Sequence, residues 1–133
     1  MTMMQVPVGL LKLSLAEAAT RQANAAIAAL EQGMFDVAMT LAGAAEGMIE
    51  RDGPHMFQWL RSAPRAREHF SQREWTSILN MERDWLKHGG AAEMTIDRAS
   101  AAFMIARAIS KLEKWTPKMD EFKIWLVANL DDL

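Results

Sequence analysis

The sequence predicts an all-α fold, an antiparallel helical bundle of four long helices with one or two short ones. Three observations predict it. Apolar residues recur at the three- and four-residue spacing of a helix along most of the chain. Cap residues, glycines and prolines separate these segments, and such short connections favour antiparallel neighbours. No strand-like alternation of apolar and polar residues competes with the helical pattern.

The domain organisation follows from length and from the first residues. The chain has 133 residues, the size of one domain, and no cysteine, so neither a disulfide framework nor a thiolate metal site supports its core. Pro7 and Gly9 oppose a regular helix near the start. We therefore expect a flexible N-terminal segment, residues 1–13, and a single helical bundle domain, residues 14–133.

The first two helices have clear boundaries. The capping box Ser14-Leu15-Ala16-Glu17 begins an alanine-rich helix that ends near Gln32, before Gly33. A second helix is predicted over residues 35–51, where apolar residues recur at helical spacing, and Asp52-Gly53-Pro54 ends it.

The middle of the chain is less regular. Residues 55–70 suggest a short helix that Pro64 breaks. A second capping box, Ser71-Gln72-Arg73-Glu74, begins a long helix that runs to about Lys87, and Gly89-Gly90 closes it.

Two helices complete the predicted bundle. Residues 96–115 form a long helix whose apolar stripe is wide, which predicts a central position. Thr116 and Pro117 have the residue types of an N-cap and a first helical position, so the last helix should cover residues 117–130.

Composition restricts the functional classes. The net charge is −2, from 15 Lys and Arg against 17 Asp and Glu, so any nucleic-acid binding must come from a local patch. No apolar run reaches the length of a membrane span, and the first residues do not resemble a signal peptide. We expect a cytoplasmic protein, bacterial in character, with no membrane association.

The second helix contains Gly43 and Gly47, which weaken a helix but allow another helix to approach closely. Tight packing within the chain is the simplest interpretation. Glu46 lies among these small residues, so we expect it to be partly buried and to need a cation. The sequence therefore predicts an ion pair between Glu46 and Arg83.

Arg83 and His88 could support phosphoryl chemistry, because Arg donates to phosphate oxygens and His transfers protons near neutral pH. A structural alternative exists, since Lys87 and His88 at a helix C-terminus complement the helix dipole. The other histidines, His55 and His69, match no metal-ligand spacing, and no phosphate loop follows a strand. We predict no metal and no cofactor.

The segment Arg83-Asp84-x3-His88 resembles the Arg-polar-x3-His signature of the HEPN superfamily, small all-α domains of which many are metal-independent ribonucleases. The stretch from Phe35 to Glu46, followed by this motif, is similar to small bacterial proteins associated with that superfamily. The resemblance covers roughly residues 15–115.

The resemblance implies a function. Arg83 and His88 would be the catalytic pair of an endoribonuclease from a toxin–antitoxin or defence system, and Asp84 would orient them. Glu46 would hold Arg83, and Lys87 would support the site. The implied partners are a second copy of the chain, single-stranded RNA, and an antitoxin or nucleotidyltransferase-like protein. The alternative is a non-catalytic dimeric helical interaction module.

An apolar surplus also favours a homodimer. Trp85 leaves the main stripe of its helix, and Ile124 and Trp125 broaden the stripe of the last one. Apolar residues that a small bundle cannot bury usually mark an interface. We expect a two-fold dimer with Arg83 and His88 of both chains in one cleft.

Overall fold

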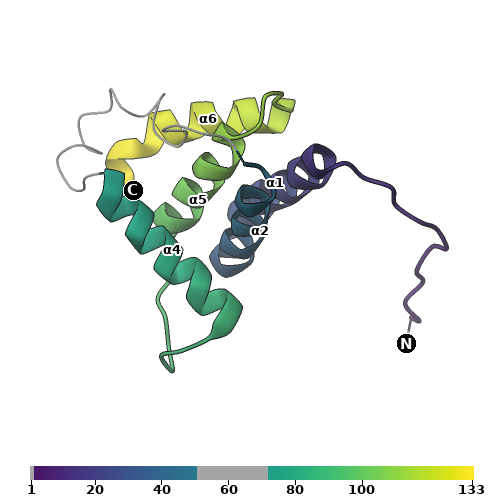
Figure 1. Cartoon of the computed structure of the whole chain (residues 1–133), viewed down its shortest axis with the longest axis horizontal. Helices are drawn as coiled ribbons and strands as arrows, with labels where there is room; N and C mark the ends of the chain where they lie inside the picture. Colours follow the sequence, from purple (N-terminus) through teal and green to yellow (C-terminus); the bar gives the residue numbers. More distant parts are fainter. Residues whose placement is uncertain (1, 51–71) are drawn as a thin grey trace.

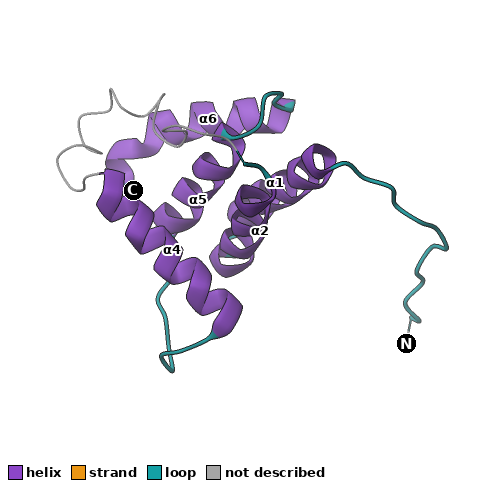
Figure 2. Cartoon of the chain, in the orientation of Figure 1, coloured by secondary structure: helices purple, strands orange, loops and turns teal. Residues whose placement is uncertain are grey.

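The computed structural model describes residues 2–50 and 72–133, and all the regular structure in these ranges is helical (Figures 1 and 2). The elements are α1 (Leu15–Glu31), α2 (Phe35–Met48), α4 (Gln72–His88), α5 (Arg98–Ser110), α6 (Pro117–Asn129) and a 3-10 turn, η1 (Leu130–Asp132). The all-α class is confirmed. The short helix predicted within residues 55–70 and the predicted cap Ser71 lie outside the described residues. The arrangement as four long antiparallel helices with one or two short ones stays a prediction.

The predicted caps of the first and last helices are present. At α1, the backbone N–H of Glu17 donates to Ser14 Oγ at 3.1 Å, and the Ser14 N–H donates to Glu17 Oε1 at 3.3 Å. At α6, Thr116 Oγ1 accepts from the Met119 N–H at 3.4 Å, and Pro117 is the first helical residue. Each cap satisfies a backbone donor that the first helical turn leaves unpaired.

Helix α2 ends three residues earlier than predicted. Its last residue is Met48, and Ile49 adopts an extended conformation with φ −112° and ψ 118°. A β-branched side chain such as Ile49 favours this conformation. The chain therefore leaves the helix directly after the turn that contains Glu46.

Helix α5 is shorter than predicted at both ends. Asp97 is its N-cap, with Oδ1 accepting from the Ser100 N–H at 2.9 Å. After α5, the indole Nε1 of Trp115 donates to the Ile109 carbonyl at 2.7 Å. This bond satisfies one of the carbonyls that the end of a helix leaves without an intrahelical partner.

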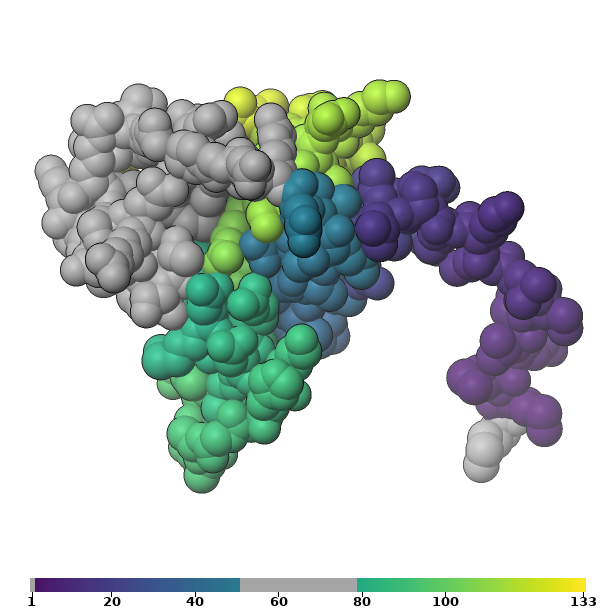
Figure 3. Space-filling view, viewed as in Figure 1, coloured from purple at the N-terminus to yellow at the C-terminus, as the bar shows by residue number. Residues whose placement is uncertain are grey.

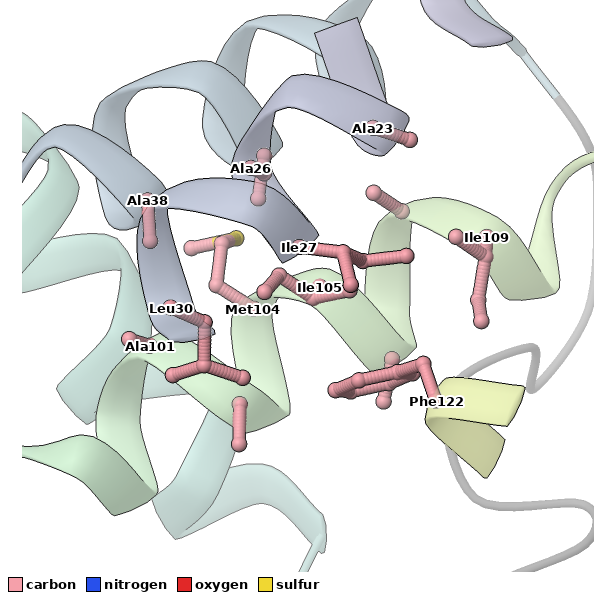
Figure 4. Close-up of a cluster of buried hydrophobic side chains, with 14 of the residues drawn as sticks. Ala23, Ala26, Ile27, Leu30, Ala38, Ala101, Met104, Ile105, Ile109 and Phe122 are labelled. Atoms are coloured by element: carbon pink, nitrogen blue, oxygen red, sulfur yellow. The ribbon is translucent and has the colours of Figure 1, made fainter. Parts of the chain in front are cut away.

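Helix α5 is central, as predicted, because it packs against α1, α2, α4 and α6 (Figure 1). Nine of its residues are buried. Alanines on α1 allow the helices to approach closely, and Figure 4 shows Ile27 and Leu30 of α1 beside Met104 and Ile105 of α5, with Phe122 of α6 on the same cluster. The core is therefore built around one helix.

Residues 2–13 form an extended arm that leads away from the helices (Figures 1 and 3). The flexibility expected for residues 1–13 stays a prediction. Among the helices of the described ranges, none combines the length and the apolar character needed to cross a bilayer.

The apolar surplus predicted for the helices is smaller than expected. Trp85 is half-buried, and its Nε1 donates to the Ala91 carbonyl at 2.7 Å. Trp125 is also half-buried, with its ring 6.2 Å from that of Phe122. Ile124 is exposed, as predicted. Both tryptophans thus have contacts within the chain, so the expectation that they are surplus was wrong.

Candidate functional site

The candidate site is centred on the carboxylate of Glu46, near the end of α2. Glu46 is 5 % exposed, although it carries a charge. Arg83 Nη1 of α4 lies 3.0 Å from Oε2, and Lys111 Nζ, just after α5, lies 2.6 Å from Oε1. Arg107 Nη2 of α5 lies 3.2 Å from the same Oε1. The predicted ion pair between Glu46 and Arg83 is confirmed, and it belongs to a cluster of three cations around one carboxylate.

Gly43 makes room for this cluster. A β-carbon at Gly43 would lie 2.9 Å from Arg83 Cδ and 3.0 Å from Cγ. The absence of a side chain therefore lets the stem of Arg83 cross α2 one turn before Glu46. Gly47 has open space at the corresponding position, so the interpretation of close packing holds for Gly43 and was wrong for Gly47.

The cations keep Glu46 ionised. Burial alone would raise the pKa of its carboxyl and is the largest single effect. The hydrogen bond from Lys111 and the charges of Arg107, Lys111 and Arg83 together outweigh burial, so the pKa of Glu46 lies below its ordinary value of 4.5. A buried charge is stable here because its oxygens have cationic donors.

Arg107 and Lys111 were not singled out from the sequence. They are four residues apart and thus on one face of the helical path, where they interrupt an otherwise apolar helix. Arg107 Nη1 also donates to Asn80 Oδ1 of α4 at 2.7 Å, and Lys111 Nζ donates to the Glu46 carbonyl at 3.1 Å. Two cations one turn apart on a central helix were the signal that a buried carboxylate would face them.

A second carboxylate, Glu82 of α4, is also buried. Its Oε1 accepts from Ser100 Oγ at 2.9 Å, while its Oε2 has no hydrogen-bond partner within the described part of the chain. Burial raises the pKa of Glu82, the charge of Asp97 raises it further, and the Ser100 hydrogen bond opposes both. Within the described residues no cation pairs with Glu82, so burial outweighs the opposing hydrogen bond and the pKa of Glu82 lies above its ordinary value.

The C-terminal end of α4 presents the remaining predicted residues to solvent. His88 and Lys87 are exposed, and Asp84 Oδ1 lies 3.7 Å from Arg83 Nε. Five residues of helix separate Arg83 from His88, which corresponds to about 140° around the axis. The two side chains therefore leave different faces of α4.

The glycines after α4 fix its end. Gly89 has φ 78° and Gly90 has φ 135°, values that side chains rarely adopt. The Gly89 N–H donates to the Trp85 carbonyl at 2.8 Å, and the Trp85 indole bonds to Ala91 beyond the turn. The backbone carbonyl and the indole of Trp85 thus fix the turn that follows His88 through one hydrogen bond each.

In residues 2–50 and 72–133, no three His, Asp or Glu side chains come together as a metal-ligand set. Comparison of the chain with protein-family models, with curated proteins and with solved structures gave no match. The arguments on function therefore depend on the geometry around Glu46 and on the sequence motif.

Proposed function

We propose that this chain is a HEPN-like domain that cleaves single-stranded RNA without a metal, with Arg83 and His88 as the catalytic pair. The observation that carries the proposal is the oriented guanidinium of Arg83. Its Nη1 is bound to buried Glu46, while 29 % of the side chain is exposed to solvent. Glu46 fixes one edge of the guanidinium, and the remaining N–H groups can donate to phosphate oxygens from the solvent.

The local charge also supports the proposal. The chain as a whole is slightly acidic, but Arg83, Arg107 and Lys111 place three positive charges around the single charge of Glu46. Asp84, at 3.7 Å from Arg83, reduces this excess without cancelling it. A phosphodiester approaching Arg83 would therefore meet a locally positive surface.

The chemistry requires two proton transfers. A neutral His88 accepts the proton of the RNA 2′-hydroxyl as that oxygen attacks the adjacent phosphorus. The bond from phosphorus to the 5′-oxygen breaks, and a protonated His88 donates a proton to the leaving oxygen. The products are a 2′,3′-cyclic phosphate and a 5′-hydroxyl, and no water is consumed. Arg83 stabilises the negative charge that develops on the phosphoryl oxygens.

A two-fold dimer supplies both histidines from one gene. In one chain, Arg83 and His88 leave different faces of α4, so a single copy does not converge them on one phosphate. Two copies meeting at the C-terminal ends of α4 would bring Arg83 of each chain near His88 of the other. The exposure of His88 at that end supports this arrangement.

One observation favours the alternative of a non-catalytic dimeric interaction module. The guanidinium of Arg83 already has two carboxylates, Glu46 at Nη1 and Asp84 at Nε. These contacts give Arg83 a structural role that needs no phosphate. In that case the exposed end of α4 would bind a protein partner rather than RNA.

The deciding experiment is cleavage of labelled single-stranded RNA in EDTA. We expect the wild type to produce fragments with 2′,3′-cyclic phosphate ends and His88→Ala to lose cleavage at least 100-fold, since proton transfer contributes about 10²–10⁴-fold. His88 is exposed, so the melting temperature should not change.

Arg21→Ala is the matched control, because it removes an exposed cation from α1, which does not contact α4 in the described residues. It should cleave like the wild type. If the wild type leaves every RNA intact while remaining a dimer, the interaction module is the better account.

A further inference from the structure

The arm, residues 2–13, carries most of the strongly exposed large apolar side chains within the described residues. Six of its side chains, Met3, Met4, Val6, Val8, Leu10 and Leu11, are between 72 and 104 % exposed. A contiguous apolar surface of this kind usually marks a binding site. The arm leads away from the helices, so its own domain does not cover it (Figure 3).

The arm has two different faces. Met4, Val6, Val8 and Leu10 occupy alternate positions, separated by Gln5, Pro7 and Gly9. In an extended chain, successive side chains point to opposite sides, so Met4, Val6, Val8 and Leu10 lie on one apolar face. A strand with one apolar face is suited to lie along a groove.

A groove of about 720 Å³ begins where the arm joins the domain. Its apolar wall consists of Leu13 at the root of the arm, Ala16 of α1, Ile49 after α2 and Leu112 after α5. Charged side chains of both signs complete the lining, among them Glu50 and Glu113 but also Lys111 and Lys114. The apolar wall of the groove therefore suits the apolar side chains of this segment.

The arm does not fill the groove of its own chain. Leu13 already lines the groove, and the residues before it lead outward (Figure 1). A return would need a tight reversal next to Leu13. Within residues 2–50, only Gly33 has a positive φ, so Gly9 does not turn the arm back.

We propose that the arm is exchanged between two copies of this chain, each arm lying in the groove of the other copy. A second copy is the occupant because of where the groove lies. In a reciprocal exchange about a two-fold axis, the points where the two arms join their domains, at Leu13 of each chain, approach each other, and each arm crosses Leu13 of its partner. The groove is lined by Leu13, so it lies where the partner's arm would pass.

The area available agrees with a stable dimer. Two arms with six exposed apolar side chains each, together with the grooves that receive them, approach the roughly 1,200–2,000 Å² of a standard interface. The exchange does not depend on the proposed ribonuclease activity, because the arm and the groove contain neither Arg83 nor His88.

The first test changes one face of the arm in the full-length chain. We expect Val6→Glu with Val8→Glu to weaken dimerisation in analytical ultracentrifugation about 100-fold or more, since the carboxylates would have to lie against the apolar wall of the groove. The matched control, Gln5→Glu with Gly9→Glu, adds the same charge to the other face and should leave the dimer intact. A β-carbon at Gly9 meets no atom within 4 Å, so the control should fold normally.

The second test uses the absence of cysteine. A chain with Val8→Cys or Leu10→Cys is mixed with a chain carrying Ile49→Cys and is oxidised. We expect a disulfide between the two chains, and none when the second cysteine replaces exposed Ile124 of α6.

Three results would overturn the proposal. The first is a monomeric wild type, which would assign the arm to a different protein. The second is an equal loss of dimer in both arm variants. The third is cross-linking to position 124 as efficient as to position 49.

Discussion

Gly43 and Arg83 pack so closely that a β-carbon at Gly43 would lie 2.9 Å from Arg83 Cδ. This contact places the guanidinium against Glu46, because the stem of Arg83 crosses α2 at the glycine. The proposed function depends on that orientation. The closeness of the two residues can be tested without any activity assay.

We expect Gly43→Ala to lower the free energy of unfolding by about 1–2 kcal/mol, a typical cost of overpacking. The new methyl group displaces Arg83 and weakens its ion pair with Glu46. Gly47→Ala is the matched control, because its β-carbon enters open space, and its higher helix propensity should raise the free energy of unfolding by about 0.5–1 kcal/mol. Urea denaturation measures both changes. Equal effects of the two variants would contradict the contact.

Glu46→Gln should lower the free energy of unfolding by about 1–3 kcal/mol at pH 7, because three cations lose their counter-charge. The pKa of Glu46 is lower in the folded than in the unfolded chain, so its stabilisation is complete above the ordinary pKa of 4.5 and is lost as the pH falls through the folded pKa. The difference between wild type and variant should therefore shrink in acid.

Glu31→Gln provides the comparison for Glu46. Glu31 also pairs with a lysine, Lys118 at 2.6 Å, but its side chain is 63 % exposed. Exposed ion pairs contribute about 0–1 kcal/mol, so the variant should change stability little. If Glu46→Gln left the free energy of unfolding unchanged, or if Glu46→Gln and Glu31→Gln changed it equally, the Glu46 cluster would not stabilise the fold.

Glu82→Gln should raise the melting temperature at pH 7. The pKa of Glu82 is higher in the folded chain, so its contribution to stability is greatest below pH 4.5 and is lost as the pH rises through the folded pKa. Glutamine keeps an oxygen that can accept from Ser100 and removes the buried charge. Calorimetry at pH 7 and pH 4 should show a gain that fades in acid, while exposed Glu121→Gln changes neither value.

The sequence predicted much of the fold because caps and periodicity are local signals. Ser14, Thr116 and the pair Gly89-Gly90 act where the pattern placed them. The end of α5 was not predicted in this way: the expected helix ran to Trp115, but α5 ends at Ser110 and the Trp115 indole donates back to the Ile109 carbonyl. That contact requires the folded loop and is absent from any helical pattern.

The sequence predicted one part of the candidate site and missed another. The pair of Glu46 with Arg83 followed from the cost of burying a charge among small residues. Arg107 and Lys111 were not predicted, because the apolar stripe of α5 indicates which face of the helix is buried but not which carboxylate its cations meet. The alternating face of the arm was missed because Pro7 and Gly9 were interpreted only as helix breakers.

The central position of α5 has a consequence for how the protein is made. Helices α1 and α2 are translated first, yet the face that they bury is covered by α5, which begins at Arg98. On the ribosome, the first half of the chain therefore waits with exposed apolar surface until α5 has left the exit tunnel. We expect nascent chains that stop before Arg98 to remain sensitive to protease and those that extend beyond α6 to become resistant, as when a domain folds as one unit.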